Sequence, residues 1–121
     1  MRLSQASIAL LVVCTLAGCN DPGEGARFEN ARIDAEQTIQ AIEAFRKDHG
    51  VYPYSLDVLA PAQLSSEFLA KHRPGGDVGF FYGRTDEGGF EFWFKYTDAG
   101  MNRCTWTGLP GAAAWECTGH I

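Results

Sequence analysis

The spacing of apolar residues changes from a helical to a strand period, and this change constrains the fold more than any other feature. Between Phe28 and Phe45 apolar residues recur every three or four positions, which places them on one face of a helix. This helical stripe consists of Phe28, Ala31, Ala35, Ile39, Ile42 and Phe45. From Phe90 to Tyr96 apolar and polar residues alternate, as in a strand with one buried face. The two patterns predict an α+β domain with a long N-terminal helix packed on a small antiparallel sheet.

We expect the long helix to begin between Glu24 and Phe28 and to end at His49. Gly50 follows the last periodic residues and can adopt the left-handed conformation that commonly ends a helix. Ile33 lies opposite the helical stripe, either as an isolated exposed apolar residue or as a partner contact.

The segment after this helix predicts extended backbone followed by two short turns. Pro53 disfavours the helical conformation for the preceding Tyr52. Serine stands at the start of the next two expected elements, where its hydroxyl can cap the first turn. These elements are a turn over residues 55–59 and a short helix from residue 65 or 66 to residue 71.

Two strands are expected next, Phe80–Arg84 and Phe90–Tyr96, joined by a short glycine-containing hairpin connection. The phenylalanines and the tyrosine of the second strand share one face, which should pack on the helical stripe. Trp93 falls on the opposite, polar face of that strand. We expect either that the loops of residues 53–74 cover it or that it is partly exposed.

The first twenty residues indicate an exported, lipid-anchored protein. A largely apolar stretch of nine residues, Ile8 to Leu16, follows a short positive start, and it is too short for a membrane-spanning helix. It leads into Leu-Ala-Gly-Cys, which resembles a bacterial lipobox whose Cys19 thiol accepts the lipid. We expect a signal peptide over 1–18, a lipidated tether over 19–27 and one domain over 28–121. The alternative is an ordinary signal peptide with a chance cysteine.

The four cysteines then predict one disulfide near the C-terminus. The first leaves with the signal peptide and Cys19 carries the lipid, so Cys104 and Cys117 remain. Disulfides persist in exported proteins, and the spacing of these two residues fits no redox or metal motif. An antiparallel register with Cys104 opposite Cys117 also places Trp106 opposite Trp115 on the same face.

The charge of the chain excludes several classes of partner. It has 10 Lys+Arg against 15 Asp+Glu, a net charge of −5, and no basic run. Nucleic-acid binding and attraction to anionic lipid both need clustered cations. We therefore expect neither nucleic acid nor a polybasic membrane contact.

The run from Ala41 to Leu64 resembles the type II secretion pseudopilins and type IV pilins. In those families a long helix ends in a Gly-x-Tyr-Pro style junction, which a Ser/Thr-Leu-x-x-Leu turn follows. The matching positions here are Phe45, Gly50, Tyr52, Pro53, Ser55, Leu56 and Leu59. The resemblance implies a pilin-like head with a loop, an antiparallel sheet and a cysteine pair near the C-terminus.

The chain also departs from these families. It carries the lipobox in place of their processing site and hydrophobic filament helix, so the resemblance implies a pilin-type head on a lipid anchor that does not polymerise through an N-terminal helix. The major pseudopilin binds calcium in an Asp- and Gly-rich loop. The nearest segments here, Asp86–Gly89 and Asp98–Asn102, match that loop poorly, and we interpret them as plain turns. We expect no metal site.

No catalytic motif connects the three histidines. His49 stands at the expected helix end, where an imidazolium interacts favourably with the helix dipole, and His72 and His120 are remote in sequence. Metalloprotease, serine-hydrolase and paired Cys/His spacings do not occur. We therefore predict a non-enzyme with no cofactor and no small-molecule substrate.

These observations predict an envelope protein that works by protein contact in assembly, secretion or adhesion. We expect its lipid to hold it in the membrane, at the periplasmic face of the outer membrane. The alternative is a small inhibitor or accessory lipoprotein, of the lysozyme-inhibitor or outer-membrane-assembly type. The candidate interaction surface is Trp93, Trp106 and Trp115, because exposed aromatic residues favour protein contacts. We expect Trp93 to be the contact residue and Trp106 or Trp115 to be structural.

Overall fold

The computed structural model describes residues 21–98, 100–109 and 111–120. The predicted signal peptide and the lipid-accepting Cys19 lie outside the described residues, so both stay predictions.

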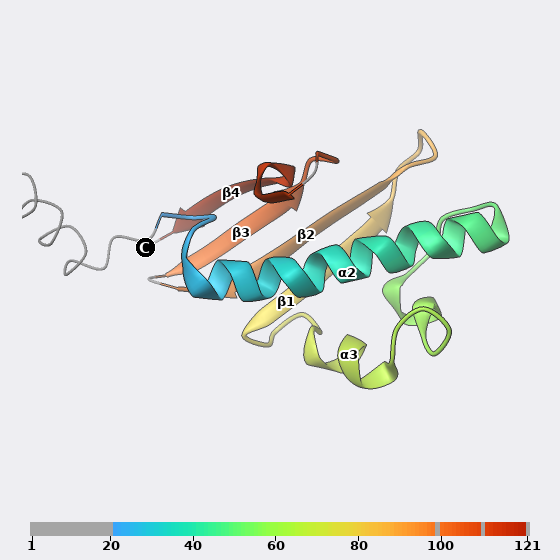
Figure 1. The fold of residues 1–121 in the computed structure, drawn as a ribbon, viewed down its shortest axis with the longest axis horizontal. Coiled ribbons are helices and arrows are strands. Elements are labelled where there is room, and N and C mark those ends of the chain that lie inside the picture. Colours follow the sequence, from blue (N-terminus) through green and yellow to red (C-terminus); the bar gives the residue numbers. More distant parts are fainter. Residues whose placement is uncertain (1–20, 99, 110, 121) are drawn as a thin grey trace, which may run out of the picture.

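One long helix packs on one face of a four-stranded antiparallel sheet with the strand order β1-β2-β3-β4 (Figure 1). The helix is α2 (Gly25–His49), and the strands are β1 (Val78–Arg84), β2 (Phe90–Thr97), β3 (Met101–Trp106) and β4 (Trp115–His120). The described residues also form three short helices, namely η1 (Leu56–Leu59), α3 (Ser66–Lys71) and η2 (Gly111–Ala114). The predicted α+β class is confirmed.

Both ends of α2 fall where the sequence predicts them. Gly50 has a φ of 79°, and its N–H donates to the Arg46 carbonyl, so it ends the helix in the left-handed conformation. The helix begins at Gly25, which lies within the expected interval. Residues 25–27, which the expected tether over 19–27 included, belong to α2.

The core lies between the helical stripe of α2 and the aromatic face of β2. Five of the six stripe residues are buried, and Phe45 at the far end is partly buried. The Phe28 ring lies 6.2 Å from the Phe94 ring and 6.2 Å from the Tyr96 ring, measured between centroids. The predicted packing of these two faces is confirmed. Ile33 is 58% exposed, on the side of the helix that faces away from the core.

The junction after α2 attaches the two short helices to the sheet. The Tyr52 ring packs on Phe90 with centroids 5.0 Å apart, and its hydroxyl donates to the Glu43 carboxylate. The Tyr82 hydroxyl donates to the Pro53 carbonyl. Ser65 caps α3 as predicted, because its hydroxyl oxygen accepts a hydrogen bond from the backbone N–H of Phe68.

The turn at η1 differs in one detail from the prediction. Ser55 occupies the position before η1, but its side chain makes no capping hydrogen bond. Serine is favoured before a helical turn because its hydroxyl can cap it, but here that cap is not formed. The turn is held in place by Leu59, whose side chain is buried in the core.

The C-terminal hairpin has the predicted register. Cys104 pairs with Cys117 and Trp106 with Trp115 across β3 and β4. The disulfide between Cys104 and Cys117 is present. The connection between the strands contains η2, and the Thr107 N–H closes it by donating to the Ala114 carbonyl.

The residues just before α2 dock onto the sheet. The Gly23 N–H donates to the Tyr96 hydroxyl oxygen at 3.0 Å. A Cβ atom on Gly23 would lie 3.2 Å from the Cys117 sulfur, and one on Gly119 would lie 2.8 Å from the Pro22 ring. This close approach explains glycine at both positions, and it joins the start of the domain to its last strand.

Candidate interaction surface

The three tryptophans do not form one surface. Trp106 and Trp115 project from the same side of the sheet as Cys104, toward α2, whereas Trp93 projects from the other side. Trp115 is 7% exposed and belongs to the core. The face of the Trp106–Trp115 pair therefore turns toward the core, so this pair and Trp93 do not form one surface, because the strand period places them on opposite faces.

Trp115 links the helix to the C-terminal hairpin. Its ring centroid lies 4.9 Å from that of Phe94 and 5.2 Å from that of Trp106, in edge-to-face contacts. Its indole N–H donates to a Glu36 carboxylate oxygen at 3.2 Å, and the same oxygen accepts from Arg32 at 2.7 Å. A buried indole that finds a hydrogen-bond partner is typical of a structural residue.

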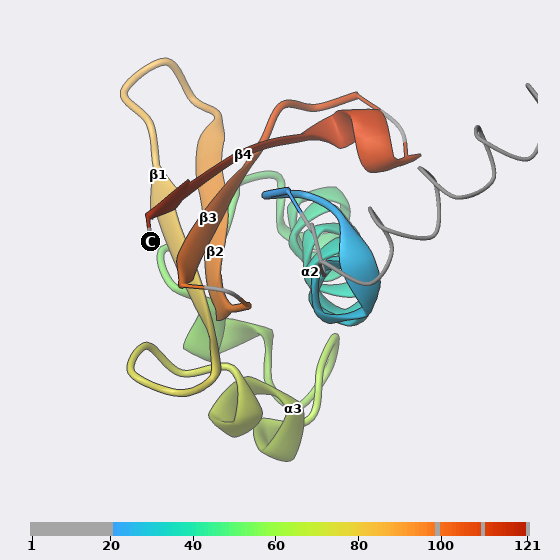
Figure 2. The same cartoon turned by 90° about the vertical axis from the view of Figure 1, so that its left-hand side faces the viewer.

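The side of the sheet that faces away from α2, which we call the outer face, is largely uncovered. Figure 2 shows α2 and η2 on one side of the sheet, and the described loop of residues 73–76 approaches the opposite side at the β1 edge, next to Gly79 and Phe81. The remaining residues of the outer face are all partly or fully exposed. They are Phe81, Gly83, Glu91, Trp93, Lys95, Thr97, Met101, Arg103, Thr105, Glu116 and Thr118.

The indole ring of Trp93 is sandwiched at the centre of this face. The Phe81 ring stacks on it with centroids 3.8 Å apart and an interplanar angle of 3°. The Arg103 guanidinium carbon lies 3.9 Å from the indole centroid. Two groups this close cannot share one side of a ring, and β2 lies between β1 and β3, so Phe81 and Arg103 cover opposite sides. Neither side of the indole is free to stack on a ligand.

Two cations stand directly opposite each other beside this stack. Lys95 pairs with Arg103 across β2 and β3, and the Lys95 nitrogen lies 5.5 Å from the Trp93 centroid. The ion pairs between described residues involve other side chains, so no described carboxylate neutralises either cation. Like charges directly opposite each other in a sheet are destabilising.

The sequence contained a signal for this cluster that we did not use. The short connection after β1 pairs Arg84 with Phe90, and that register alone places Phe81 opposite Trp93. The sequence does not assign Arg103 to this cluster in the same way. The register of β3 against β2 depends on the turn between them, and residue preferences do not determine the geometry of that turn.

An apolar cleft of about 280 Å³ runs along the outer edge of β1. Leu56 and Tyr54 lie on one wall, and Phe81 and Tyr82 on the strand wall. Phe81 therefore belongs both to the cleft and to the outer-face stack. Pockets with a mostly apolar lining and a few polar groups are common ligand sites. His72 is one of the polar residues that line this cleft.

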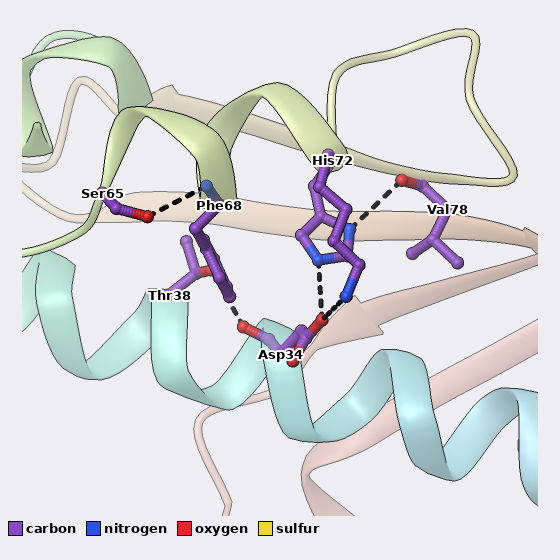
Figure 3. A network of polar contacts seen from close by, with 7 residues as sticks. Asp34, Thr38, Ser65, Phe68, His72 and Val78 are labelled. Carbon is purple, nitrogen blue, oxygen red and sulfur yellow. Dashed lines mark hydrogen bonds and ion pairs between the residues drawn. The ribbon is translucent and has the colours of Figure 1, made fainter.

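The buried His72 connects three elements (Figure 3). Its Nε2 atom lies 2.7 Å from the Asp34 carboxylate of α2, and its Nδ1 atom lies 3.4 Å from the Val78 carbonyl at the start of β1. Its ring also stacks on Phe80 with centroids 4.0 Å apart. The Lys71 nitrogen reaches the same Asp34 oxygen at 3.3 Å. Both imidazole nitrogens face acceptors inside the fold, so in this geometry the ring holds α3 against α2 and β1.

No motif in the sequence predicts this network. Asp34 lies on the edge of the helical stripe, and the buried Thr38 and Ala41 widen the buried side of α2 next to it. Small residues beside an apolar stripe are the only sequence signal that a second element packs there. His49 stands at the end of α2 and stacks on Phe45 with centroids 4.2 Å apart, far along the helix from this network.

The two turns weighed as calcium loops are hairpin connections in the structure. In the first, the Thr85 N–H donates to the Gly89 carbonyl, and Gly88 has a φ of 86°. In the second, the Asn102 side-chain amide donates to the Asp98 carbonyl at 2.8 Å. Within the described ranges, no cluster of three or more His, Cys, Asp or Glu residues is placed to hold a metal ion.

The stability of the folded state should depend on pH through the buried Tyr82. Burial raises the pKa of the Tyr82 phenol to about 12, above the ordinary value of 10. The folded state therefore holds this proton more tightly than the unfolded state, so its contribution to stability is complete below pH 10 and is lost as the pH rises toward 12. In an absorbance titration, we expect Tyr82→Phe to reduce the tyrosinate signal at high pH by one phenol, beside Tyr52 and Tyr96, whose pKa values burial also raises. An unchanged signal at high pH in the variant would contradict the assignment.

No family model matches the chain, and no curated protein or solved structure matches it. In the part of the chain that the structure describes, no helix combines the length and apolar character needed to cross a membrane.

Proposed function

We propose that this protein is a lipid-anchored, non-catalytic protein of the bacterial envelope, with a pilin-like head that binds a partner protein through the outer face of its sheet. The observation that carries this proposal is the outer-face stack. Phe81, Trp93 and Arg103 form a rigid aromatic and cationic centre on a side of the sheet that the described chain leaves uncovered. Tryptophan and arginine are the residues most enriched at energetically important interface positions.

The lipobox at Leu16–Cys19 supports the anchor, and the docking of the following residues supports a position close to the bilayer. Gly23 is held by Tyr96 in the folded domain. The two residues Cys19 and Asn20 then span at most about 7 Å before the described part of the chain begins. The partner is therefore expected at or near the membrane surface, which we propose to be the periplasmic face of the outer membrane.

The lipid anchor has a direct test in Cys19→Ala. In the wild type, radiolabelled palmitate should enter the protein, and intact mass should show a mature chain that begins at acylated Cys19. The variant should lose the label and move from the outer-membrane fraction to the soluble envelope fraction, because one residue carries the whole anchor. A soluble wild-type protein that retains residues 1–18 would contradict the proposal.

The binding surface is tested by photo-crosslinking in cells. A photoreactive amino acid at Thr105, which pairs with Trp93 on the outer face, should capture a partner protein. Trp93→Ala should remove most of that capture while the protein remains folded, because a partly exposed aromatic pair contributes only ~1 kcal/mol to folding beyond its buried area. The matched control carries the photoreactive residue at the exposed Gln37 of α2 and should not capture the same protein. Capture from Thr105 that survives Trp93→Ala would show that the Trp93 stack does not carry the binding.

A further inference from the structure

We infer that the outer face recognises an acidic segment of its partner protein, and that Lys95 and Arg103 bind carboxylates of that segment. This inference rests on the proposed function and specifies the chemistry of the partner. It begins from an unfavourable feature: two cations stand directly opposite each other, and no described carboxylate pairs with either. The whole chain has an excess of acidic residues, yet none of the ion pairs between described residues includes Lys95 or Arg103.

The Arg103 guanidinium is held ready for a carboxylate. Its central carbon lies 3.9 Å from the Trp93 ring centroid, and Phe81 stacks on the other side of the indole. A guanidinium placed over an aromatic ring can keep N–H donors free at its edge, where they match a carboxylate in a bidentate contact. The exposed position of Arg103 leaves that edge accessible. Because the stack restricts the side chain before binding, little rotamer entropy is lost in forming the contact.

The covered indole argues against a sugar ligand. Aromatic residues usually bind sugar rings through an open ring face, and both faces of Trp93 are occupied by Phe81 and Arg103. The cations beside the ring, and not the ring itself, are the groups that remain available to a ligand.

The distribution of charge on this face favours a protein over an anionic membrane. Glu116 lies in the same row of the sheet as Trp93, and Glu91 lies beyond Trp93 on the side away from the cations. The cations and the carboxylates of this face therefore occupy different rows, and the uncharged Thr97 and Met101 lie beyond the cations. A uniformly anionic lipid surface would repel the carboxylates, whereas a protein segment with carboxylates at one end and a cation at the other complements both rows.

The test uses the full lipidated chain with the photoreactive residue at Thr105. Charge reversal in Lys95→Glu and in Arg103→Glu should each reduce capture about tenfold or more, as expected when a close interfacial charge pair becomes repulsive. The matched control, Lys47→Glu on the exposed side of α2, makes the same charge change and should leave capture within a factor of two. The crosslinked segment of the partner, identified by mass spectrometry, should contain Asp or Glu.

A charge swap then separates recognition from misfolding. A synthetic peptide with the sequence of the crosslinked segment should bind the wild type in detergent micelles, and lysine in place of its acidic residues should abolish binding. The Lys95→Glu, Arg103→Glu double variant should bind the lysine peptide instead, which a misfolded variant cannot do.

Each contrary outcome has a distinct meaning. Capture that is insensitive to both charge reversals, or a crosslinked segment without carboxylates, overturns this inference and leaves the proposed binding surface standing. Crosslinks to a second copy of this chain, or tighter binding to vesicles of phosphatidylglycerol than of phosphatidylcholine that the two reversals abolish, also overturn it. Absence of any capture from Thr105 overturns both this inference and the proposed function.

Discussion

Replacing Trp115 with alanine should lower the free energy of unfolding by about 3–5 kcal/mol, the range measured for buried aromatic residues. The side chain is 7% exposed, and it contacts Phe94 of β2 and Trp106 of β3. The substitution also removes the indole N–H that donates to Glu36, which couples β4 to α2. For a domain whose whole stability is of the order of 5–15 kcal/mol, such a loss brings it close to unfolding.

Urea denaturation followed by circular dichroism measures this effect, and two matched variants separate its causes. Trp115→Phe keeps an aromatic ring but not the hydrogen bond, so it should cost clearly less than alanine. Trp93→Ala removes the same atoms from the outer face and should also cost less, because that side chain is only partly buried. A Trp115→Ala cost below that of Trp93→Ala would contradict the assignment of Trp115 to the core.

Loss of the disulfide is the second large effect. The bridge joins residues 13 positions apart, and closing a loop of this size stabilises a protein by about 3 kcal/mol in the chain-entropy model. We expect the Cys104→Ala, Cys117→Ala double variant to unfold at a correspondingly lower urea concentration. The start of the domain should loosen with it, because Gly23 lies against the Cys117 side chain.

Thiol titration provides an independent measurement. The mature, lipidated chain, denatured without reductant, should show no free thiol, and it should show two after reduction. Cys117→Ala should show one thiol without reductant. Two free thiols in the unreduced wild type would contradict both the bridge and the role assigned to it in stability.

Local patterns were sufficient to predict α2 and the C-terminal hairpin. The helical stripe and Gly50 determine where the helix lies and ends, because both signals act within one or two turns. The register of β3 and β4 followed from Cys104 and Cys117, because a disulfide between antiparallel strands leaves a single alignment. In both cases the residues that carry the signal also make the contact.

The candidate site was predicted only in part, because its residues make their contacts with elements that are distant in the sequence. The period of β2 correctly placed Trp93 on the face away from the helix, but the sequence left open whether the face that carries Trp106 and Trp115 turns outward or toward the core. The side of the sheet that α2 covers decides which of them is buried. That choice depends on the packing of two elements that are distant in the chain.

The sequence by itself therefore determined the elements, the fold class and the disulfide, since periodicity, helix ends and cysteine pairing are short-range properties. Only the tertiary structure decided the environment of each functional candidate. It buried Trp115, brought Asp34 to His72 across 38 positions of sequence, and stacked Phe81 and Arg103 on Trp93. The physical reason is that a side chain's exposure and partners depend on which strands are neighbours and which face the helix covers, and those depend on contacts between residues far apart in the chain.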